Sequence, residues 1–297
     1  MIKDQIILVD SDNSMLSDPI KKRATDVLVR SFDSAIITNV NANPHNCVKF
    51  ANVIKNTNSI VVIWNNLKPF STYAIDLCNR FDSDYVIIER GIVPSQGDDN
   101  YAFYSNGICF DNTNISPENF DPNTYDKNLE TIKNYYRSQN LHRKEPVEKI
   151  VFVGQLLFDS TITHYTRIDS YDAFIDSYIK EKSIDTNKTE IVYCPHPRMP
   201  TKESKYKISN KKTVEECLDA KYVVAVSSTI IYELVGLNIP VKIVGQGPYK
   251  FPTDRGWDEI LKCHSTALDF HFNSQTEPAQ IKTIIEKTIN ITRATKK

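Results

Sequence analysis

Four stretches of the chain place acidic, basic and hydroxyl side chains where an apolar run ends. They are "VIIERGIVPS" with Glu89 and Arg90, "IVFVGQLLFDSTI" with Gln155, Asp159 and Ser160, "TEIVYCPHPR" with His196 and Arg198, and "YVVAVSSTIIYELVGL" with Ser227, Ser228, Thr229 and Glu233. In open α/β sheets, ligands bind beyond the carboxyl ends of the strands. These positions are therefore where the sequence predicts chemistry.

Two of the four stretches offer a carboxylate. Glu89 directly follows the apolar residues "YVII", and Asp159 lies four residues beyond Gln155. A partly buried carboxylate has a raised pKa and can act as a general acid or base. Taken alone, the position of Glu89 favours a solvated loop, and Asp159 could simply cap a helix.

The third stretch mounts an imidazole between two rigid residues. Pro195 and Pro197 restrict the backbone on both sides of His196. Arg198 adds a planar fork of donors that suits phosphate or carboxylate. A histidine with a purely structural role is the alternative, and the rigid mounting beside an arginine favours a functional one.

The fourth stretch predicts an anion site. Ser227 and Ser228 end an apolar run and open a helix, and hydroxyls with free backbone N–H groups at such a point bind phosphate without net positive charge. Glu233, on the same helix, could reach the ribose of a nucleotide whose phosphate binds at the two serines. A serine N-cap followed by a surface glutamate is the simpler alternative. The Gly/Pro/aromatic stretch 245–257 is suited to covering a ligand.

Several classes of protein are disfavoured by what the sequence lacks. It contains neither G-x-G-x-x-G after the first strand nor G-x-x-x-x-G-K-[ST], and no His, Cys and Asp residues have metal-ligand spacing. We therefore expect no metal and no bound cofactor. The six scattered cysteines indicate reduced thiols, with Cys78, Cys109 and Cys194 as small core residues.

Net charge and apolar pattern further restrict the partners and the location that we expect for the protein. A net charge of -1 over 297 residues gives no general attraction to nucleic acid, so an anionic ligand must be met locally. The first residues, "MIKDQIILVD", lack the features of a signal peptide, and no run approaches the ~20 apolar residues of a membrane span. We expect a cytoplasmic protein. The amphipathic C-terminal stretch favours a packed closing helix, with a peripheral anchor at the inner membrane as the alternative.

Short Ile/Val-rich runs alternate with amphipathic stretches along the whole chain, a pattern typical of parallel sheets covered by helices on both faces. The alternation breaks in an Asn/Asp/Pro/Tyr-rich region, residues 111–148, and then restarts. This predicts an α/β protein with two Rossmann-type domains, residues 1–145 and 146–297, whose sheets face each other across a cleft. The predicted anion site lies in the second domain.

The ordered motifs resemble the retaining β-Kdo glycosyltransferases of bacterial capsule and lipopolysaccharide assembly, which have the GT-B architecture. "ERGIVPSQ", "VGQLLFDSTI", "CPHPR" and "SSTIIYELVGLNIPV" follow the family's order, and the likeness covers about residues 60–257. Arg90 stands where the family usually has Asp, and Pro94 where it has Arg.

The resemblance implies a role for each candidate residue. Asp159 would be the nucleophile, Glu89 the acid/base on the acceptor hydroxyl, and His196 the group that assists CMP departure. The donor, CMP-Kdo or a related CMP-sugar, would be held by Gln155, Ser160, Arg198, Ser227, Ser228, Thr229 and Glu233, with Arg198 or Arg90 pairing the sugar carboxylate. The acceptor would be a surface glycan or glycolipid held by the first domain, and the second domain would hold the donor.

Three other functions remain open from the sequence. "CPHPR" and the paired serines also resemble inverting CMP-sialic acid transferases, and Asp159 in its "GQ…DST" setting favours the retaining family. A non-catalytic nucleotide-sugar-binding subunit of a glycan assembly complex is the second alternative. A nucleotide-sugar epimerase on the same fold is the third.

Overall fold

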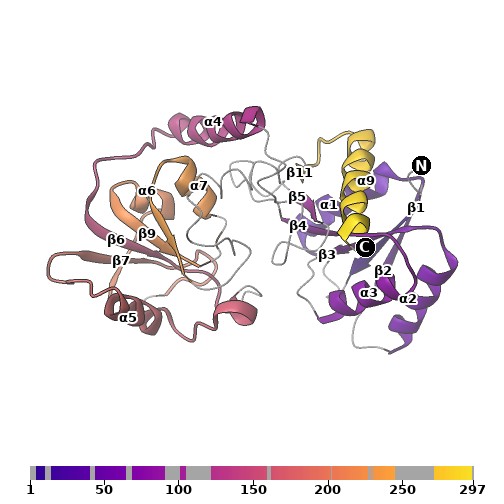
Figure 1. The fold of residues 1–297 in the computed structure, drawn as a ribbon, viewed down its shortest axis with the longest axis horizontal. Coiled ribbons are helices and arrows are strands. Elements are labelled where there is room, and N and C mark those ends of the chain that lie inside the picture. The colour runs from indigo at the N-terminus through magenta and orange to yellow at the C-terminus, as the bar shows by residue number, and fades with distance from the viewer. Residues whose placement is uncertain are drawn as a thin grey trace. The chain divides into compact units, whose positions relative to one another are not determined.

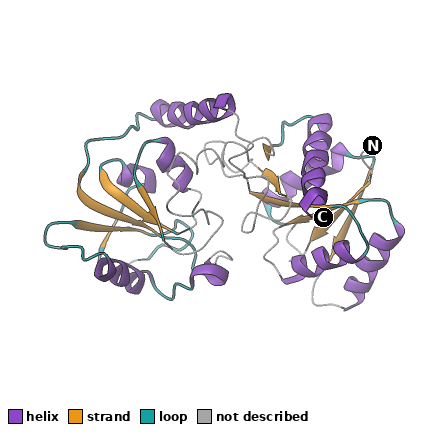
Figure 2. Cartoon of the chain, viewed as in Figure 1, coloured by secondary structure: helices purple, strands orange, loops and turns teal. Residues whose placement is uncertain are grey.

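The computed structural model describes residues 5–10, 15–40, 44–64, 69–90, 101–104, 122–158, 162–201, 203–226, 228, 230–244 and 271–295. The chain divides into two compact units. The first joins residues 1–121 to residues 263–297, and the second is residues 122–262. Each unit is an α/β domain with a sheet of its own (Figures 1 and 2).

The first unit is built on a six-stranded sheet of order β11-β5-β4-β3-β1-β2. Strands β1 to β4 run parallel, whereas β5 and β11 pair antiparallel at one edge. The elements are β1 (Gln5–Asp10), α1 (Pro19–Ser31), β2 (Ser34–Asn39), α2 (Pro44–Asn56), β3 (Ile60–Trp64), α3 (Pro69–Arg80), β4 (Tyr85–Arg90), β5 (Tyr101–Tyr104), β11 (His271–Phe272) and α9 (Pro278–Thr295).

Continuous apolar runs explain the central position of β1 and β3. All five residues of β3 are buried, as are the last five of β1, as expected for strands covered on both faces. Helices α1 and α9 cover one face, and Figure 1 shows α2 and α3 on the other. Asp18 caps α1 by accepting hydrogen bonds from the backbone N–H groups of Ile20 (2.8 Å) and Lys21 (3.2 Å).

The C-terminal helix corrects the predicted domain division. Residues 263–297 were expected in the second domain, but α9 packs against α1 in the first unit. Ile281, Ile285 and Ile289 lie in the first unit's core, and Arg293 forms a two-pronged ion pair with Asp84 (2.9 and 2.8 Å). The apolar face of α9 is therefore used inside the unit, which confirms a packed closing helix.

The second unit has a five-stranded sheet of order β10-β9-β6-β7-β8, in which every pairing is parallel. Its elements are α4 (Pro122–Ser138), β6 (Val147–Val153), the π-helical turn η3 (Ile162–Thr166), α5 (Tyr171–Glu181), β7 (Glu190–Cys194), β8 (Lys207–Ile208), α6 (Thr213–Cys217), β9 (Ala220–Ala225), α7 (Ile230–Gly236) and β10 (Val241–Ile243). The strand order reverses between β6 and β9, and such a switch point is where open α/β sheets bind ligands.

Helix α4 moves the boundary between the units upstream of residue 145. The boundary falls at residue 121, and α4 belongs to the second unit, where it contacts α7. The contact is close, because a Cβ added at Gly236 would lie 2.8 Å from Cγ2 of Ile132. A glycine at this position lets the two helices approach each other.

Helix α3 begins at Pro69, and the buried hydroxyl of Ser71 in its first turn donates to the carbonyl of Trp64 (3.2 Å). The sequence predicted parallel sheets only, whereas β5 and β11 add an antiparallel edge. Phe103 and Phe272 stack there with ring centroids 4.6 Å apart.

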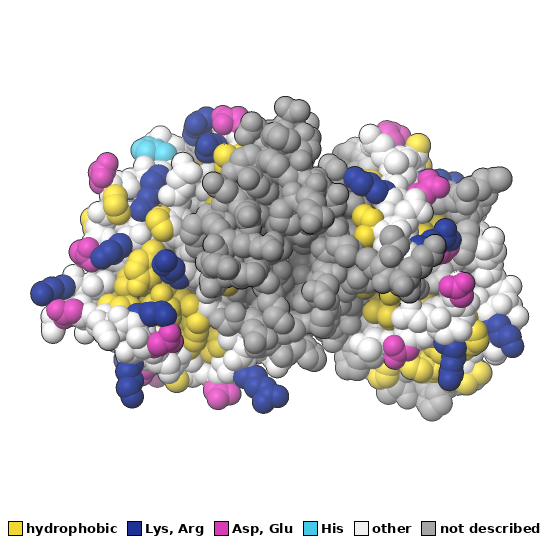
Figure 3. Space-filling view, viewed as in Figure 1, with side chains coloured by type: hydrophobic (Ala, Val, Ile, Leu, Met, Phe, Trp, Pro, Cys, Tyr) yellow, Lys and Arg dark blue, Asp and Glu magenta, His cyan; other side chains and the backbone are white. Residues whose placement is uncertain are grey.

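Surface charge and cysteine burial agree with the sequence where they are described. Lys/Arg and Asp/Glu side chains are interspersed on the face shown in Figure 3. Cys78 and Cys194 are buried as predicted, Cys217 is buried as well, and Cys109 lies outside the described residues. No helix of the described part is long and apolar enough to cross a bilayer.

Candidate functional site

Three neighbouring strands of the second unit bring the predicted residues to one edge of the sheet. Gln155 follows β6, His196 follows β7 and Ser228 follows β9. The register pairs Val153 with Cys194, and Phe152 with Val224, so the three strands end at nearly the same level. With strands spaced about 4.8 Å apart, the ends of β7 and β9 lie about 10 Å apart with β6 between them.

A glycine and two tyrosines set the path of the chain at the end of β6. The Gly154 N–H donates to the carbonyl of Cys194 (2.7 Å), and a Cβ at Gly154 would lie 2.8 Å from the Tyr193 hydroxyl oxygen. The Tyr171 ring stacks on that of Tyr193, with centroids 5.2 Å apart. Only a residue without a side chain fits between this aromatic pair and the β7 backbone.

Tyr171 also holds the main chain of Gln155 from both sides. Its hydroxyl accepts from the Gln155 N–H (2.5 Å) and donates to the Gln155 carbonyl (3.0 Å). Tyr171 stands at the start of α5, whose N-cap Ser170 accepts from the N–H of Ala173 (3.2 Å). The sequence reasoning missed Tyr171, because an aromatic residue in the first turn of a helix has the pattern of ordinary core packing.

The His196 imidazole has a defined hydrogen-bond role on one side. Its Nδ1 accepts from the backbone N–H of Arg198 (3.1 Å), and its carbonyl accepts from the N–H of Met199 (2.8 Å). A nitrogen that accepts carries no proton, so the neutral ring has its proton on Nε2. The tight turn thus presents a half-buried imidazole with an Nε2–H donor beside the exposed Arg198.

The region after β9 combines a half-buried hydroxyl with a buried acid. The Ser228 carbonyl accepts from the N–H of Ile231 (3.1 Å) and its hydroxyl from the N–H of Ile230 (3.4 Å), which start α7. Glu233, one turn further on, is only 6% exposed, so it is not the surface residue of the simpler alternative. Burial raises the pKa of Glu233 to about 7. Within the described residues, no cation or donor contacts this carboxyl group.

Glu89 is placed in the first unit. It is half-buried near the end of β4 and pairs with Ala102 of the antiparallel strand β5. Arg90 follows as the last residue of β4, level with Tyr101, and its side chain lies outside the description. Glu89 thus lies at the carboxyl end of a central parallel strand, as predicted.

Four predicted site residues fall outside the described part of the chain: Asp159, Ser160, Ser227 and Thr229. The description ends at Phe158, whose side chain is 69% exposed, and resumes at Ile162. The roles of these four residues stay predictions. In the part of the chain that is described, no three His, Cys, Asp or Glu side chains lie close enough to hold a metal ion.

Comparison with known proteins shows the fold. No protein-family model and no curated protein matches the chain. Among solved structures, the chain is similar to the β-Kdo 2,7 transferase of KpsC from Thermosulfurimonas dismutans, with a TM-score of 0.61 and 15% identity over 97% of this chain and 99% of that one. The β-Kdo 2,4 transferase of the same KpsC gives a TM-score of 0.56 and 15% identity over 95% of this chain and 97% of that one. The chain therefore has the GT-B-like fold predicted from its sequence, with two sheets that are mainly parallel.

Proposed function

We propose that this protein is a glycosyltransferase that moves Kdo from CMP-Kdo to a surface-glycan acceptor with retention of configuration. The observation that carries the proposal is the match between motif order and strand order. The "GQ", "HP" and serine motifs follow β6, β7 and β9, the three strands around the switch point of a fold shared with two β-Kdo transferases.

The donor lies over the switch point in this proposal. The phosphate of CMP accepts a hydrogen bond from Nε2–H of His196 and contacts the turn at Ser227 and Ser228. The Glu233 carboxylate accepts from the ribose hydroxyls. Arg198 or Arg90 pairs with the sugar carboxylate, since a guanidinium binds a carboxylate through two parallel hydrogen bonds. No metal is needed for this set of contacts.

Transfer then takes two displacements at the anomeric carbon. The Asp159 carboxylate attacks that carbon, the bond to the phosphate oxygen breaks, and CMP leaves with the bonding electrons. Glu89 next removes the proton of the acceptor hydroxyl, whose oxygen attacks the same carbon while the ester to Asp159 breaks. Each step inverts the centre, so the product retains its configuration, as in retaining glycosidases.

The test is to trap the intermediate. Glu89→Gln protein incubated with CMP-Kdo and no acceptor should carry one Kdo residue by intact-mass spectrometry. The adduct should be absent from the Glu89→Gln/Asp159→Asn double variant. Glu286→Gln removes an exposed carboxylate on α9 of the same unit and should turn over normally without accumulating an adduct.

Each contrary outcome points to a different function. An unmodified mass with product of inverted configuration would favour the CMP-sialic acid transferase type, which a screen of CMP-Kdo, CMP-sialic acid and UDP-sugars would resolve. Absence of both CMP binding and turnover would favour a non-catalytic subunit. Turnover without any acceptor would favour an epimerase.

A further inference from the structure

A pocket of about 620 Å³ opens at the carboxyl ends of β1 and β2 in the first unit. No motif of the sequence analysis falls in it. Its lining comes from the two strand ends, from the residues just before α1 and from the first half of α2. In sheets of this kind, the carboxyl edge is where ligands bind.

The pocket presents five polar side chains of different kinds: Asp10, Ser17, Thr38, Asn46 and Lys49. Asp10 and Thr38 are buried, each 6% exposed, whereas Lys49 is exposed. The Asp10 carboxylate also accepts a hydrogen bond from the Met15 N–H (3.1 Å), which orients it. The set therefore contains one oriented carboxylate, one cation, one amide and two hydroxyls.

Two apolar side chains complete the described lining. Leu16 is 57% exposed and Ile37 is 40% exposed, both high for large aliphatic residues. Because apolar surface in contact with water is costly, a ligand that covered these side chains would gain binding energy. A polar pocket with an aliphatic wall suits a ligand with hydroxyl groups on its rim and C–H groups on its face.

The chemistry of the lining restricts the class of ligand that the pocket can bind. The described lining contains no aromatic ring on which a nucleotide base could stack, and its single carboxylate is too little for a divalent cation. Free phosphate could pair with Lys49 but has no C–H face to cover Leu16 and Ile37. A sugar unit that bears one acid group fits both charges, since its acid pairs with Lys49 and its hydroxyls donate to Asp10.

The pocket lies on the same sheet edge as Glu89. The registers align Val9 with Ile63, and Ile63 with Ile87, so Asp10 is level with Ile88, one residue before Glu89. The strand order is β4-β3-β1-β2. At about 4.8 Å per strand, β1 lies about 10 Å and β2 about 14 Å from β4, which is a span of a few sugar units.

We propose that the pocket at the ends of β1 and β2 binds an acidic sugar unit of the acceptor glycan, a few units from the hydroxyl that reacts. The link to the acceptor rests on the function proposed above, whereas binding of the sugar acid does not. The pocket would select acceptors by charge and hold the chain along the sheet edge.

The test uses the full chain and two small probes, methyl β-glucuronide and neutral methyl β-glucoside. The methyl NMR signals of Leu16 and Ile37 report on the pocket directly. The glucuronide should shift these signals and bind more tightly than the glucoside. Lys49→Gln should weaken glucuronide binding about tenfold and leave glucoside binding unchanged. Lys55→Gln changes an exposed lysine in the last turn of the same helix and should alter neither.

Transfer kinetics test the link to the acceptor. With an acidic acceptor glycan, Lys49→Gln should raise the acceptor KM about tenfold at unchanged kcat, while Lys55→Gln should match the parent protein. Absence of methyl shifts with either probe, or equal glucuronide affinity in Lys49→Gln, would overturn the binding site. Methyl shifts of the expected pattern in a protein that transfers no sugar would retain the site and reject the proposed function.

Discussion

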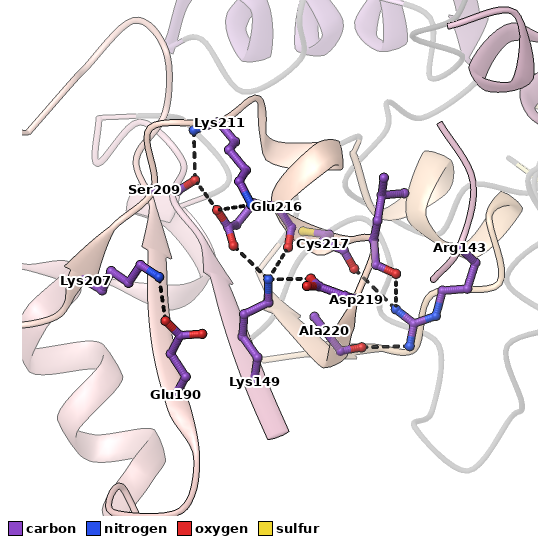
Figure 4. Close-up of polar contacts among 11 residues, drawn as sticks. Arg143, Lys149, Glu190, Lys207, Ser209, Lys211, Glu216, Cys217, Asp219 and Ala220 are labelled. Atoms are coloured by element: carbon purple, nitrogen blue, oxygen red, sulfur yellow. Dashed lines mark hydrogen bonds and ion pairs between the residues drawn. The ribbon is translucent and has the colours of Figure 1, made fainter. Parts of the chain in front are cut away.

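The two ends of the sheet in the second unit differ in whether a buried charge has a partner of opposite charge. At the amino end, Lys149 of β6 is 3% exposed and Glu216 of α6 is 4% exposed. Lys149 donates to the Glu216 carboxylate (2.8 Å) and to its backbone carbonyl (2.9 Å), and it also pairs with Asp219. Figure 4 shows this network, in which each buried charge meets an opposite one.

Side chains around the network satisfy its remaining polar atoms. Ser209 donates to the other Glu216 oxygen (2.7 Å), and Arg143 donates to the carbonyls of Leu218 (2.9 Å) and Ala220 (2.7 Å) (Figure 4). Burial favours the neutral acid at Glu216, but the hydrogen bonds from Lys149 and Ser209 outweigh it and lower the pKa of Glu216. Such a fully paired network holds the sheet together.

At the carboxyl end, the buried acid is without such partners. Glu233 has a pKa raised to about 7 by burial alone, and no described residue supplies a counter-charge. The contrast between Glu216 and Glu233 gives a criterion that separates structural from functional charges in this fold. A charge whose partners come from the chain stabilises the fold, and one whose partner must come from outside is a candidate for binding a ligand.

A substitution of Lys149 tests the structural role of the network at the amino end of the sheet. Replacing it by Met leaves the buried carboxylate of Glu216 without its cation, and we expect the free energy of unfolding to fall by about 3–5 kcal/mol. Urea denaturation at pH 7 measures this. Lys221→Met removes the cation of an exposed pair with Glu148 on the same sheet and should cost less than about 1 kcal/mol. Equal losses in the two variants would contradict the structural role of the network.

Glu233→Gln should raise the free energy of unfolding instead of lowering it, and only above pH 4.5. The pKa of Glu233 is about 7 when folded and 4.5 ordinarily, so the folded state holds the proton more tightly. Its contribution to stability is full below pH 4.5 and is lost as the pH rises to 7, about 3 kcal/mol in all. Relative to the parent protein, Glu233→Gln should therefore gain stability between pH 4.5 and 8.

The same variant should lose ligand affinity. Cytidine lacks the phosphate, so its binding reports on the ribose contacts without a ligand titration near pH 7. Calorimetry should show parent affinity falling below pH 7 as Glu233 takes up its proton, and a weaker, pH-independent affinity in Glu233→Gln. Parent affinity that does not vary with pH would contradict the assignment of Glu233 to the ribose.

The carboxyl end was predictable from the sequence because its signals are local. Val153, Cys194 and Ala225 each end a strand, and a polar or rigid residue follows within three positions. Period and composition therefore give the strands, the helices and the residues that stand at the strand ends. Glu89 and His196 lie at strand ends as predicted.

The remaining features depend on contacts between distant residues. The return of α9 to the first unit involves contacts with distant residues, such as the pair between Arg293 and Asp84, 209 residues apart. The network at Lys149 needs Glu216, 67 residues away. The strands β5 and β11 are short and meet only in the fold, so neither carries a period of its own. Local patterns contain no information on such partners.

Gly154→Ala disturbs the carboxyl end of the sheet without changing a charge. The new Cβ would lie 2.8 Å from the Tyr193 hydroxyl oxygen and 3.1 Å from the Cys194 carbonyl, so we expect a loss of about 1–3 kcal/mol in unfolding free energy. Combining it with Tyr193→Phe removes the nearest atom and should recover part of the loss. A double variant no more stable than Gly154→Ala would place the strain elsewhere.

Tyr171→Phe is the smallest change and tests what positions the main chain of Gln155 at the carboxyl end of the sheet. The ring still stacks on Tyr193, but the buried N–H and carbonyl of Gln155 lose the hydroxyl that serves both. We expect a stability loss of about 1–2 kcal/mol. Tyr135→Phe, which removes a hydroxyl from an exposed ring on α4, is the matched control and should be neutral.

The rate of adduct formation separates positioning from simple stability. In the proposed mechanism the nucleophile Asp159 is four residues beyond Gln155 in the sequence, so a shifted Gln155 backbone should slow Kdo transfer to Asp159 in Tyr171→Phe. Lys149→Met, although far less stable, should form the adduct at the parent rate under conditions where it is folded. If both variants slowed adduct formation equally, the two ends of the sheet would not be functionally distinct, and the difference between their buried charges would be one of stability alone.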